Sequence, residues 1–505
     1  MRFFSTLGFV AIISLPACAQ VSRATPPLEF PFQSISGDAI DASWTLGEVT
    51  GVTPEHYTVV LDRENGTSTL GSVRFHGNEN GVYQALWKTI PLDADRETAF
   101  LLEYSWDQLL HEDNVQSLVW VRIDLGDGML GMLDNRAFAP TPTKSWQSST
   151  IRAAIPKEAD AVTIGVGMFG SGEVNFDSLK VQMGVGGNSN ATSVKATAYV
   201  DEFLNIVSSQ AMMRENVDWP QMRLDMTALS QGAQSSVDTY PALNFCLAAL
   251  KDRHSQIMTP EFLKELESKN RGGSNAEEPS TSGLTMPASD RLANDIGYLW
   301  LPGILSFDDA GPQAYASTLA RALEELSDCK GFVIDLRQDG GGNMWPMLAG
   351  LGPLLGAEVV GRFQYPNGDA EEWWWRDGWS GQADIPCTEV IPPHSSIFPN
   401  DIPVALLTSR RTGSSGEATL VAFLGRPNTR TFGQATAGLS TGNSSISLSD
   451  GALLLLTTSS YADRTGKVYG HEITPDVQVP ALQANAEDQA MLRAQAWLAD
   501  VLFEE

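Results

Sequence analysis

Two short turns carry the residue types that could do chemistry. The first, RQDGGGN at 337–343, follows a strand-like apolar run at 331–336 and precedes an apolar helix that begins near Met344. Glycine lets backbone N–H groups approach a ligand, and such a turn before a helix can hold an anion or an oxyanion. A phosphate-binding loop is the competing interpretation. That loop ends in Gly-Lys-Ser/Thr, whereas this turn has no lysine and does not fit G-x-G-x-x-G.

The second turn lies within TSRRTGSSGEATLVAFLG, after a predicted strand at 403–408 and before a helix that starts at about Ser414. At a helix N-terminus, the dipole and the free N–H groups stabilise negative charge as it forms. Ser414 or Ser415 is therefore a candidate nucleophile. Helix capping is the alternative, with Ser415 as the cap and Glu417 as an acid of the first turn.

A serine hydroxyl needs a base, and His254 is the candidate. It follows an apolar helical pattern in CLAALKDRHSQIMTP and sits in a polar turn. A lone histidine is by default a surface or hydrogen-bonded residue, so His254 gains meaning only beside the two turns. The other histidines fall in the predicted β domain, in a Pro-rich loop and in a later acidic segment: His56, His76, His111, His394 and His471.

An acid could orient the histidine and stabilise its charge, as in a Ser-His-acid triad. The segment DRTGKVYGHEITPDVQVP offers Asp463, Glu472 and Asp476. On so acidic a chain, each of them is by default a solvated surface residue.

Composition narrows the classes of function. The 505 residues are enough for about three domains, and 42% hydrophobic with 19% charged residues is typical of globular proteins. With 33 Lys+Arg against 61 Asp+Glu, the net charge is −28, which repels phosphate backbones and excludes general nucleic-acid binding. Cys246, Cys329 and Cys387 are far apart and do not cluster with histidine as in a zinc site. We therefore predict no metal and no organic cofactor.

The N-terminus is typical of an export signal. In MRFFSTLGFVAIISLPACAQ, an apolar run at 7–15 follows Arg2 and leads to the cleavage-like Ala-Cys-Ala at 17–19. We predict a signal peptide at 1–19 and a periplasmic or extracellular protein. The alternative is a lipid anchor on Cys18, because Leu-Pro-Ala-Cys at 15–18 resembles a lipobox, although Pro16 is unusual there. No later segment reaches the roughly 18 apolar residues of a membrane span.

The rest of the chain predicts a multidomain α+β protein in three parts. Short alternating runs and turn clusters at 27–183 predict a β-sandwich or jelly roll. Helical spacing at 194–269, interrupted by Asp-Trp-Pro at 218–220, predicts a helical subdomain. From 283 to 505, strand-like runs alternate with helical stretches, which predicts an α/β domain that ends in an amphipathic helix at 484–503.

Taken together, these segments resemble the C-terminal processing (tail-specific) and tricorn-type serine peptidases over about 200–480. The likeness rests on L-x-D-x-H-S at 250–255, IGYLWLP at 296–302, IDLRQDGGGNMWPM, TGSSGEATLVAFLGRPNTRTFGQATAG and the closing ITPDV. It implies a crotonase-like α/β core, a βαβ superhelix that cleaves peptide or protein substrates. At the N-terminus, SWQSSTIRAAIPKEADAVTIGVGMFGSGEVNFDSLKV resembles carbohydrate-binding-module-like sandwiches, which makes a glycan a second candidate partner. A docking domain without a sugar site is the alternative.

The resemblance assigns roles to single residues. In this family the nucleophile lies three residues before a glutamate, which implies Ser414 here, because Glu417 follows at that spacing. The N–H of Ser415 would be one oxyanion donor, and Gly341 or Gly340 would supply the other.

Members of the family use one of two bases. Ser–Lys members carry the lysine shortly after Thr-x-Gly, and here Leu439 holds that position after TAG at 436–438. The Ser–Lys dyad is therefore lost. Tricorn-type members use Ser-His-Glu, and His254 lies in the matching segment. The separation from Ser414 favours Glu472 as the acid, with Asp463 in reserve.

The chain also departs from the family, because it has no PDZ-like segment and none of tricorn's propellers. The predicted function is an exported serine peptidase that acts through an acyl-enzyme. One alternative is an inactive peptidase-like scaffold with a glycan-binding sandwich, and another is an esterase with the same triad. The acid discriminates between them, because a triad whose acid does not reach His254 is a weaker case for activity.

Overall fold

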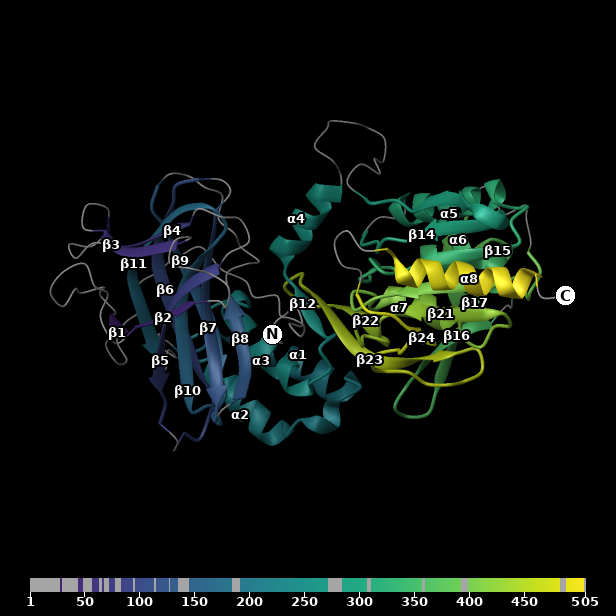
Figure 1. Cartoon of the computed structure of the whole chain (residues 1–505). Coiled ribbons are helices and arrows are strands. Elements are labelled where there is room, and N and C mark those ends of the chain that lie inside the picture. The colour runs from purple at the N-terminus through teal and green to yellow at the C-terminus, as the bar shows by residue number, and fades with distance from the viewer. Residues whose placement is uncertain are drawn as a thin grey trace. The chain divides into compact units, whose positions relative to one another are not determined.

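The computed structural model describes residues 28–29, 44–48, 57–62, 66–67, 72–77, 83–93, 96–112, 115–126, 128–134, 145–183, 191–270, 284–306, 310–356, 359–391, 398–481 and 487–503. The predicted signal peptide and Cys18 lie outside them. The chain forms two compact units (Figure 1). The first ends with Arg214–Lys251, and the second comprises Gln210–Met213 and the chain from Asp252 onward. Within the described ranges, no helix is long and apolar enough to cross a membrane.

Two antiparallel sheets make up most of the first unit. One has the strand order β3-β4-β11-β6-β9, with β1 paired to β11, and the other has the order β2-β5-β10-β7-β8. The strands are β1 (Leu28–Glu29), β2 (Thr45–Glu48), β3 (Tyr57–Asp62), β4 (Ser72–Gly77), β5 (Tyr83–Pro91), β6 (Phe100–Leu110), β7 (Gln116–Leu125), β8 (Gly128–Asp134), β9 (Gln147–Ile155), β10 (Ala161–Phe169) and β11 (Gly172–Met183).

The inward faces of these two sheets share one apolar core. Alternation places Ile164 and Val166 of β10 on the inner face, where they are fully buried. They belong to the same hydrophobic cluster as Leu102 and Tyr104 of β6, which lies in the other sheet.

Three α-helices and two short 3-10 turns complete the first unit: α1 (Val194–Gln210), η2 (Arg214–Asn216), α2 (Trp219–Leu229), η3 (Val237–Thr239) and α3 (Tyr240–Leu250). The Asp-Trp-Pro sequence starts α2, because the Asp218 carboxylate accepts the Gln221 N–H at 3.1 Å and Pro220 lies in the first turn. Asp225 of α2 accepts the Ala99 N–H at 2.9 Å, which ties this helix to the start of β6. The division at 27–183, 194–269 and 283–505 stays a prediction.

The second unit contains a six-stranded sheet in which all neighbours except one pair run parallel. Its order is β13-β14-β15-β20-β21-β24, and only β13 pairs in the antiparallel sense. The strands are β13 (Ala288–Leu292), β14 (Ile296–Trp300), β15 (Gly331–Asp335), β20 (Val404–Thr408), β21 (Thr429–Gly433) and β24 (Val477–Gln478), with η4 (Ala293–Asp295) between the first two.

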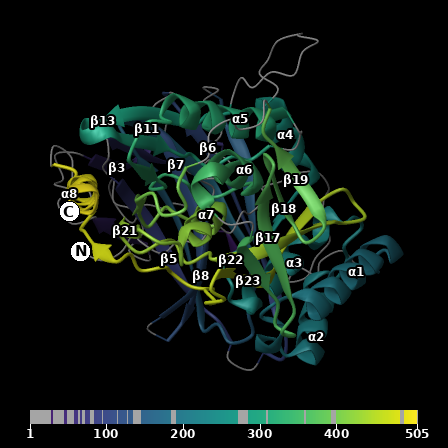
Figure 2. The same cartoon turned by 90° about the vertical axis from the view of Figure 1, so that its right-hand side faces the viewer.

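Helices cover both faces of this sheet. On one face, Phe332 and Ile334 of β15 share a core with α5 (Ala310–Glu325), α6 (Trp345–Leu355) and α7 (Ser415–Phe423), which Figure 2 shows near one another. On the other face, Val333 packs with α8 (Gln489–Phe503), the yellow helix of Figure 1. Strands buried on both faces read as continuous apolar runs, which explains GFVID and VALLT.

A second, antiparallel sheet of this unit has the order β12-β23-β16-β17-β18-β19, with β22 also paired to β23. Its strands are β12 (Gln256–Met258), β16 (Val359–Gln364), β17 (Ala370–Arg376), β18 (Trp379–Gln382), β19 (Ile385–Glu389), β22 (Thr441–Ser447) and β23 (Leu453–Asp463), and α4 (Pro260–Asn270) follows β12. The mixed α+β, multidomain architecture is confirmed. The finer names sandwich, jelly roll and crotonase-like stay predictions.

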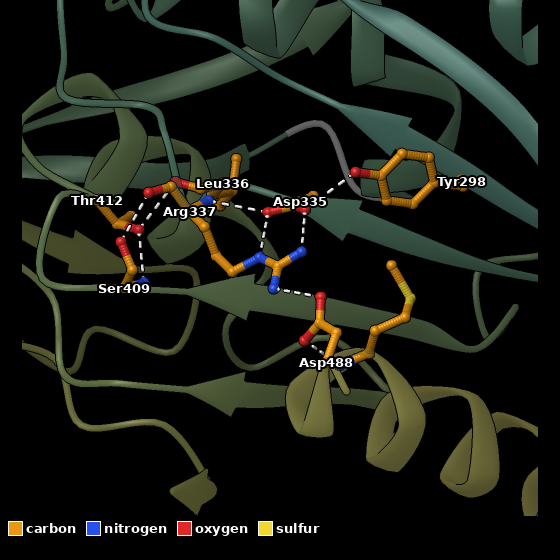
Figure 3. A network of polar contacts seen from close by, with 8 residues as sticks. Tyr298, Asp335, Leu336, Arg337, Ser409, Thr412 and Asp488 are labelled. Atoms are coloured by element: carbon orange, nitrogen blue, oxygen red, sulfur yellow. Dashed lines mark hydrogen bonds and ion pairs between the residues drawn. The ribbon is translucent and has the colours of Figure 1, made fainter. Parts of the chain in front are cut away.

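Arg337 fastens the C-terminal helix to the parallel sheet (Figure 3). Its Nε and Nη2 donate to the two carboxylate oxygens of Asp335 at 2.9 and 2.6 Å, and its Nη1 donates to Asp488 at 2.6 Å. Asp488 also accepts the Met491 N–H at 3.1 Å in the first turn of α8. Tyr298 donates to Asp335 at 3.0 Å. Arg337 thus binds Asp335 through two hydrogen bonds and links the end of β15 to the start of α8.

Removing Arg337 should destabilise the second unit strongly. We expect Arg337→Leu to cost about 3 kcal/mol, because it leaves the buried Asp335 carboxylate without a charge partner, whereas Asp488→Ala should cost about 1 kcal/mol through the lost cap. Urea unfolding measures both. The matched control is Arg321→Leu on the exposed face of α5. An Arg337→Leu variant as stable as this control would contradict the assigned role.

Candidate active site

The glycine turn and the serine turn meet because they follow neighbouring parallel strands. β15 pairs with β20, with Asp335 opposite Leu407, so both turns leave the same edge of the sheet at its carboxyl end. Side chains then join them. Thr412 Oγ1 donates to Leu336 O at 2.8 Å, and Ser409 Oγ donates to Arg337 O at 2.6 Å (Figure 3).

Ser414 is the N-cap of α7 and has φ 52° and ψ −115°. This region of φ is costly for a residue with a Cβ, so the surrounding bonds must hold it there. One of them is the Ser414 N–H, which donates to Glu417 Oε2 at 3.1 Å. The cap is thus Ser414, one residue earlier than the capping alternative placed it. Ser415 Oγ is buried without a hydrogen-bond partner, whereas Ser414 is partly exposed.

Glu417 joins the serine turn to the loop at 436–439. Its buried carboxyl group accepts the N–H groups of Gly438 and Leu439 at 3.1 and 2.7 Å and the hydroxyl of Thr436, besides the Ser414 N–H. Burial raises the pKa of Glu417 to about 7, and these hydrogen bonds act in the opposite direction. These four donors tie the start of α7 to the loop at 436–439.

His254 lies within hydrogen-bond distance of this serine. Its Nε2 is 3.0 Å from Ser414 Oγ, and its Nδ1 is 2.7 Å from Thr441 Oγ1. A neutral imidazole has one N–H donor, so an Nδ1–H that donates to Thr441 leaves Nε2 free to accept the Ser414 proton. The pair is then arranged for nucleophilic attack with base assistance.

The D-x-H-S segment explains how His254 is held. Asp252 Oδ1 accepts the N–H groups of His254 and Ser255, both at 2.9 Å, and Asp252 Oδ2 accepts the Ser255 hydroxyl at 2.6 Å. This side-chain turn is typical of aspartate. Asn443 Nδ2 donates to His254 O at 3.1 Å, and β12 then pairs with β23, which anchors the turn on the antiparallel sheet.

Burial keeps His254 neutral. The residue is 8% exposed, and desolvation lowers the pKa of His254 to about 4, against the smaller raising effect of the Asp252 charge. Above that pH the imidazole is free to act as a base. Asp252 is thus the carboxylate whose charge acts on His254, although its oxygens bind backbone and hydroxyl groups of the turn rather than the ring.

The structure does not bring either predicted acid to His254. The Asp463 carboxylate accepts the N–H groups of Thr465 and Lys467 and the hydroxyls of Thr465 and Tyr469, so it closes the turn after β23. Glu472 is exposed. Thr441 holds the position at Nδ1 that the triad hypothesis gave to Glu472 or Asp463. Glu472 was predicted from its sequence separation, and the acid of the triad stays a prediction.

Two N–H groups could stabilise an oxyanion at this point. Ser415 is the first residue of α7, where N–H groups have no intrahelical partner and the helix dipole favours negative charge. Gly341 lies against the nucleophile: a Cβ there would be 2.9 Å from Ser414 Cβ and 3.4 Å from its Oγ, so only glycine fits. Gly340 is farther away, since its Cβ would meet only Arg411 O at 3.7 Å.

A tyrosine that the sequence analysis passed over stands beside Ser414. Tyr461 of β23 is buried, and burial raises its pKa well above 10, with a smaller raising effect of Glu417 and a lowering hydrogen-bond contact with Ser414. Its ring packs against Trp373 and Phe363, with centroids 5.1 and 5.9 Å away. Trp373 is fully buried and packs against Tyr461.

Sequence signals for the missed residues differ. Asp252 precedes His254 by two residues, a spacing typical of a side-chain turn, and could have been found. Thr441 stands among several hydroxyl residues in LSTGNSSIS, and nothing local distinguishes it. In the described part of the chain, no three His, Cys, Asp or Glu side chains come together as a metal site would require.

Thr441 and Glu472 can be compared directly as partners of His254. Thr441→Val should slow the reaction of Ser414 with a fluorophosphonate probe by about fivefold, because one net hydrogen bond is worth about 1 kcal/mol. Thr441→Ser keeps the hydroxyl and is the matched control. Glu472→Gln should change the rate by less than about twofold, as an exposed substitution. A larger effect of Glu472→Gln than of Thr441→Val would restore the acid.

Comparisons with known proteins find a family model and relatives that match part of the chain. Residues 295–479 match the model of peptidase family S41. The chain is 26% identical over 296 residues to a nisin-resistance protein of Lactococcus lactis subsp. lactis, which covers 57% of this chain and 85% of that protein.

Two solved structures are similar in part. A lipoprotein from Streptococcus agalactiae has 24% identity and a TM-score of 0.49, covering 62% of this chain and 99% of its own. The photosystem II D1 C-terminal processing protease has 16% identity and a TM-score of 0.39, covering 60% of this chain and 97% of its own. The family match at 295–479 confirms the predicted resemblance to C-terminal processing peptidases. The carbohydrate-binding-module likeness of the N-terminal part stays a prediction. Over residues 295–479, this chain carries a domain of peptidase family S41.

Proposed function

We propose that the chain is an exported serine peptidase that hydrolyses peptide bonds through an acyl-enzyme. The observation that carries this proposal is the 3.0 Å separation of Ser414 Oγ and His254 Nε2 at the start of α7. Peptide or protein substrates follow from the family of the domain. The export part rests on the N-terminal sequence at 1–19, with a lipid anchor through Cys18 as its alternative.

The reaction begins with attack of Ser414 Oγ on a peptide carbonyl carbon while His254 Nε2 takes the hydroxyl proton. The carbonyl oxygen becomes an oxyanion and accepts the N–H of Ser415, with Gly341 as the second donor. His254 then protonates the leaving amine, and the C–N bond breaks. Water attacks the ester that remains, His254 takes its proton, and the carboxylic acid and free Ser414 are released.

The third member of the triad is the hydroxyl of Thr441 in this proposal. It holds the imidazole tautomer in which Nε2 accepts a proton, which is the orienting part of a triad acid's role. The electrostatic part of that role is carried by Asp252, whose negative charge raises the pKa of His254 without a bond to the ring. A neutral hydroxyl stabilises imidazolium less than a bonded carboxylate would, so we expect a slower nucleophile than in a full Ser-His-Asp triad.

Two other functions remain to be separated from this one. An inactive scaffold with a glycan-binding N-terminal unit would have no need of a serine at a costly φ that faces a neutral histidine. An esterase with the same residues would share the acyl-enzyme and differ only in the bond that it cleaves.

Labelling with a fluorophosphonate tests the proposal first. The full chain should label, and both Ser414→Ala and His254→Ala should lose labelling, because the probe reports an activated serine. Ser415→Ala is the matched control and should retain it, since its hydroxyl is buried. Absence of labelling in the wild type would favour the scaffold, and peptide against ester substrates would then separate peptidase from esterase among labelled proteins.

The pH dependence of labelling follows from His254. Because its pKa is lowered to about 4, the base stays unprotonated at neutral pH, and the rate should fall only as the pH drops through about 4. An unperturbed histidine would lose activity near about 6.5. Asp252→Asn removes the charge that raises the pKa, so its midpoint should lie lower still. A midpoint at or above that of free histidine would contradict a buried neutral base.

A further inference from the structure

Asp339 is a buried carboxyl group directly under the nucleophile, and the reaction described above does not use it. It is fully buried, its Oδ1 accepts the Gly341 N–H at 3.1 Å, and its backbone oxygen accepts the Gly413 N–H at 2.9 Å. Its Oδ2 is buried and has no hydrogen-bond partner. The residue therefore holds the proposed oxyanion donor on one side and the start of the serine turn on the other.

Glycines enclose this carboxyl group tightly. A Cβ on Gly416 would lie 2.5 Å from Asp339 O and 2.9 Å from its Cγ. A Cβ on Gly303 would lie 3.3 Å from Asp339 Oδ1 and 2.4 Å from Gly341 O. Contacts under 3.0 Å do not occur for real side chains, so backbone from the segment after β14 and from the start of α7 closes over the group.

Among the described residues, no Lys, Arg or His side chain forms an ion pair with Asp339. The titratable groups that face it are Tyr315 of α5 and Tyr461 of β23, whose pKa values its charge raises. Glu417, also acidic, follows Gly416 on α7. The nearby arginines point elsewhere: the Arg337 guanidinium binds Asp335 and Asp488, and Arg411 is exposed. Burial therefore raises the pKa of Asp339 to about 8, against a lowering effect of the Gly341 N–H.

We propose that Asp339 is a positioning residue whose protonation decides whether the Gly341 N–H can serve the oxyanion. The inference rests on the proposed function and adds a control to the same site. The protonated acid offers Gly341 a weak carbonyl acceptor, which gives way when an oxyanion forms. The carboxylate binds the same N–H about twice as strongly and places a second negative charge beside the oxyanion.

The consequence is an alkaline limit on the reaction that His254 cannot cause. His254 loses its proton far below neutral pH and stays a competent base as the pH rises. Asp339 is neutral below pH 8 and charged above it, so the rate should fall as the pH passes through that value. Glu417, whose pKa burial raises to about 7, is retained in the Asp339→Asn variant and contributes to both profiles.

The experiment compares fluorophosphonate labelling of the full chain and of Asp339→Asn between about pH 6 and 10, with Ser414→Ala as the blank. Asparagine keeps an Oδ1 acceptor for Gly341 and cannot ionise. The labelling rate of each protein at each pH is divided by its own rate at the lowest pH. The comparison is then between the shapes of the two pH profiles. The wild type should lose at least about tenfold across this range, a part of the 100- to 1,000-fold that a lost oxyanion donor costs, and Asp339→Asn should lose clearly less.

Equal losses in the two proteins, or no loss in the wild type, would overturn the role of Asp339. A wild type that fails to label at the lowest pH, or a Ser414→Ala variant that labels, would instead overturn the proposed function and this inference with it.

A second measurement needs no variant. In wild-type protein with ¹³C at the aspartate carboxyl carbons, one aspartate resonance should titrate near pH 8, far from the usual value of about 3.9. Absence of any aspartate that titrates above about pH 6 would overturn the proposal even if Asp339→Asn did not fold.

Discussion

Parallel pairing of β15 with β20 is the constraint on which the site depends. Parallel neighbours end at the same edge of a sheet, so the turn after each strand meets the turn after the other. One turn supplies Gly341, which lies against Ser414, and the other supplies Ser414, the candidate nucleophile. The histidine comes from outside this sheet, and the hydrogen bonds of Asp252, Asn443 and Thr441 bring it to the same edge. Binding and orientation are thus divided between two sheets of one unit.

One residue at this edge of the sheet has an unfavourable backbone conformation. Ser414 has a φ that costs of the order of 1–3 kcal/mol in a residue with a side chain. Glu417 offsets that cost by accepting hydrogen bonds from the Ser414 N–H and from three donors of the loop at 436–439. The Glu417 carboxyl group is buried in this position, and burial raises its pKa. Burial also raises the pKa of Asp339. Ser414 therefore lies near two acidic side chains whose pKa values are both raised.

Much of this arrangement follows from local sequence, and the remainder depends on long-range pairing. Ser414, the glycine turn and His254 each stand at a strand or helix end with a clear pattern, and the structure brings them together. Glu472 was predicted as the acid from its separation from Ser414, and sequence separation does not show where the intervening chain runs. Thr441 reaches His254 because β22 and β12 both pair with β23. The register between strands that lie so far apart in the chain cannot be predicted from neighbouring residues. Asp339 is visible in the sequence only as part of a turn, since its burial comes from glycines at 303 and 416.

The C-terminal helix has a consequence for when the protein can become active. α8 packs on the face of the parallel sheet that carries Val333, and Asp488 at its start completes the partners of Arg337. It follows every strand of that sheet in the chain. During synthesis, that face therefore stays open to water until α8 has emerged and packed on it. The sheet that carries the candidate nucleophile Ser414 is therefore covered on both faces only after α8 has folded onto it.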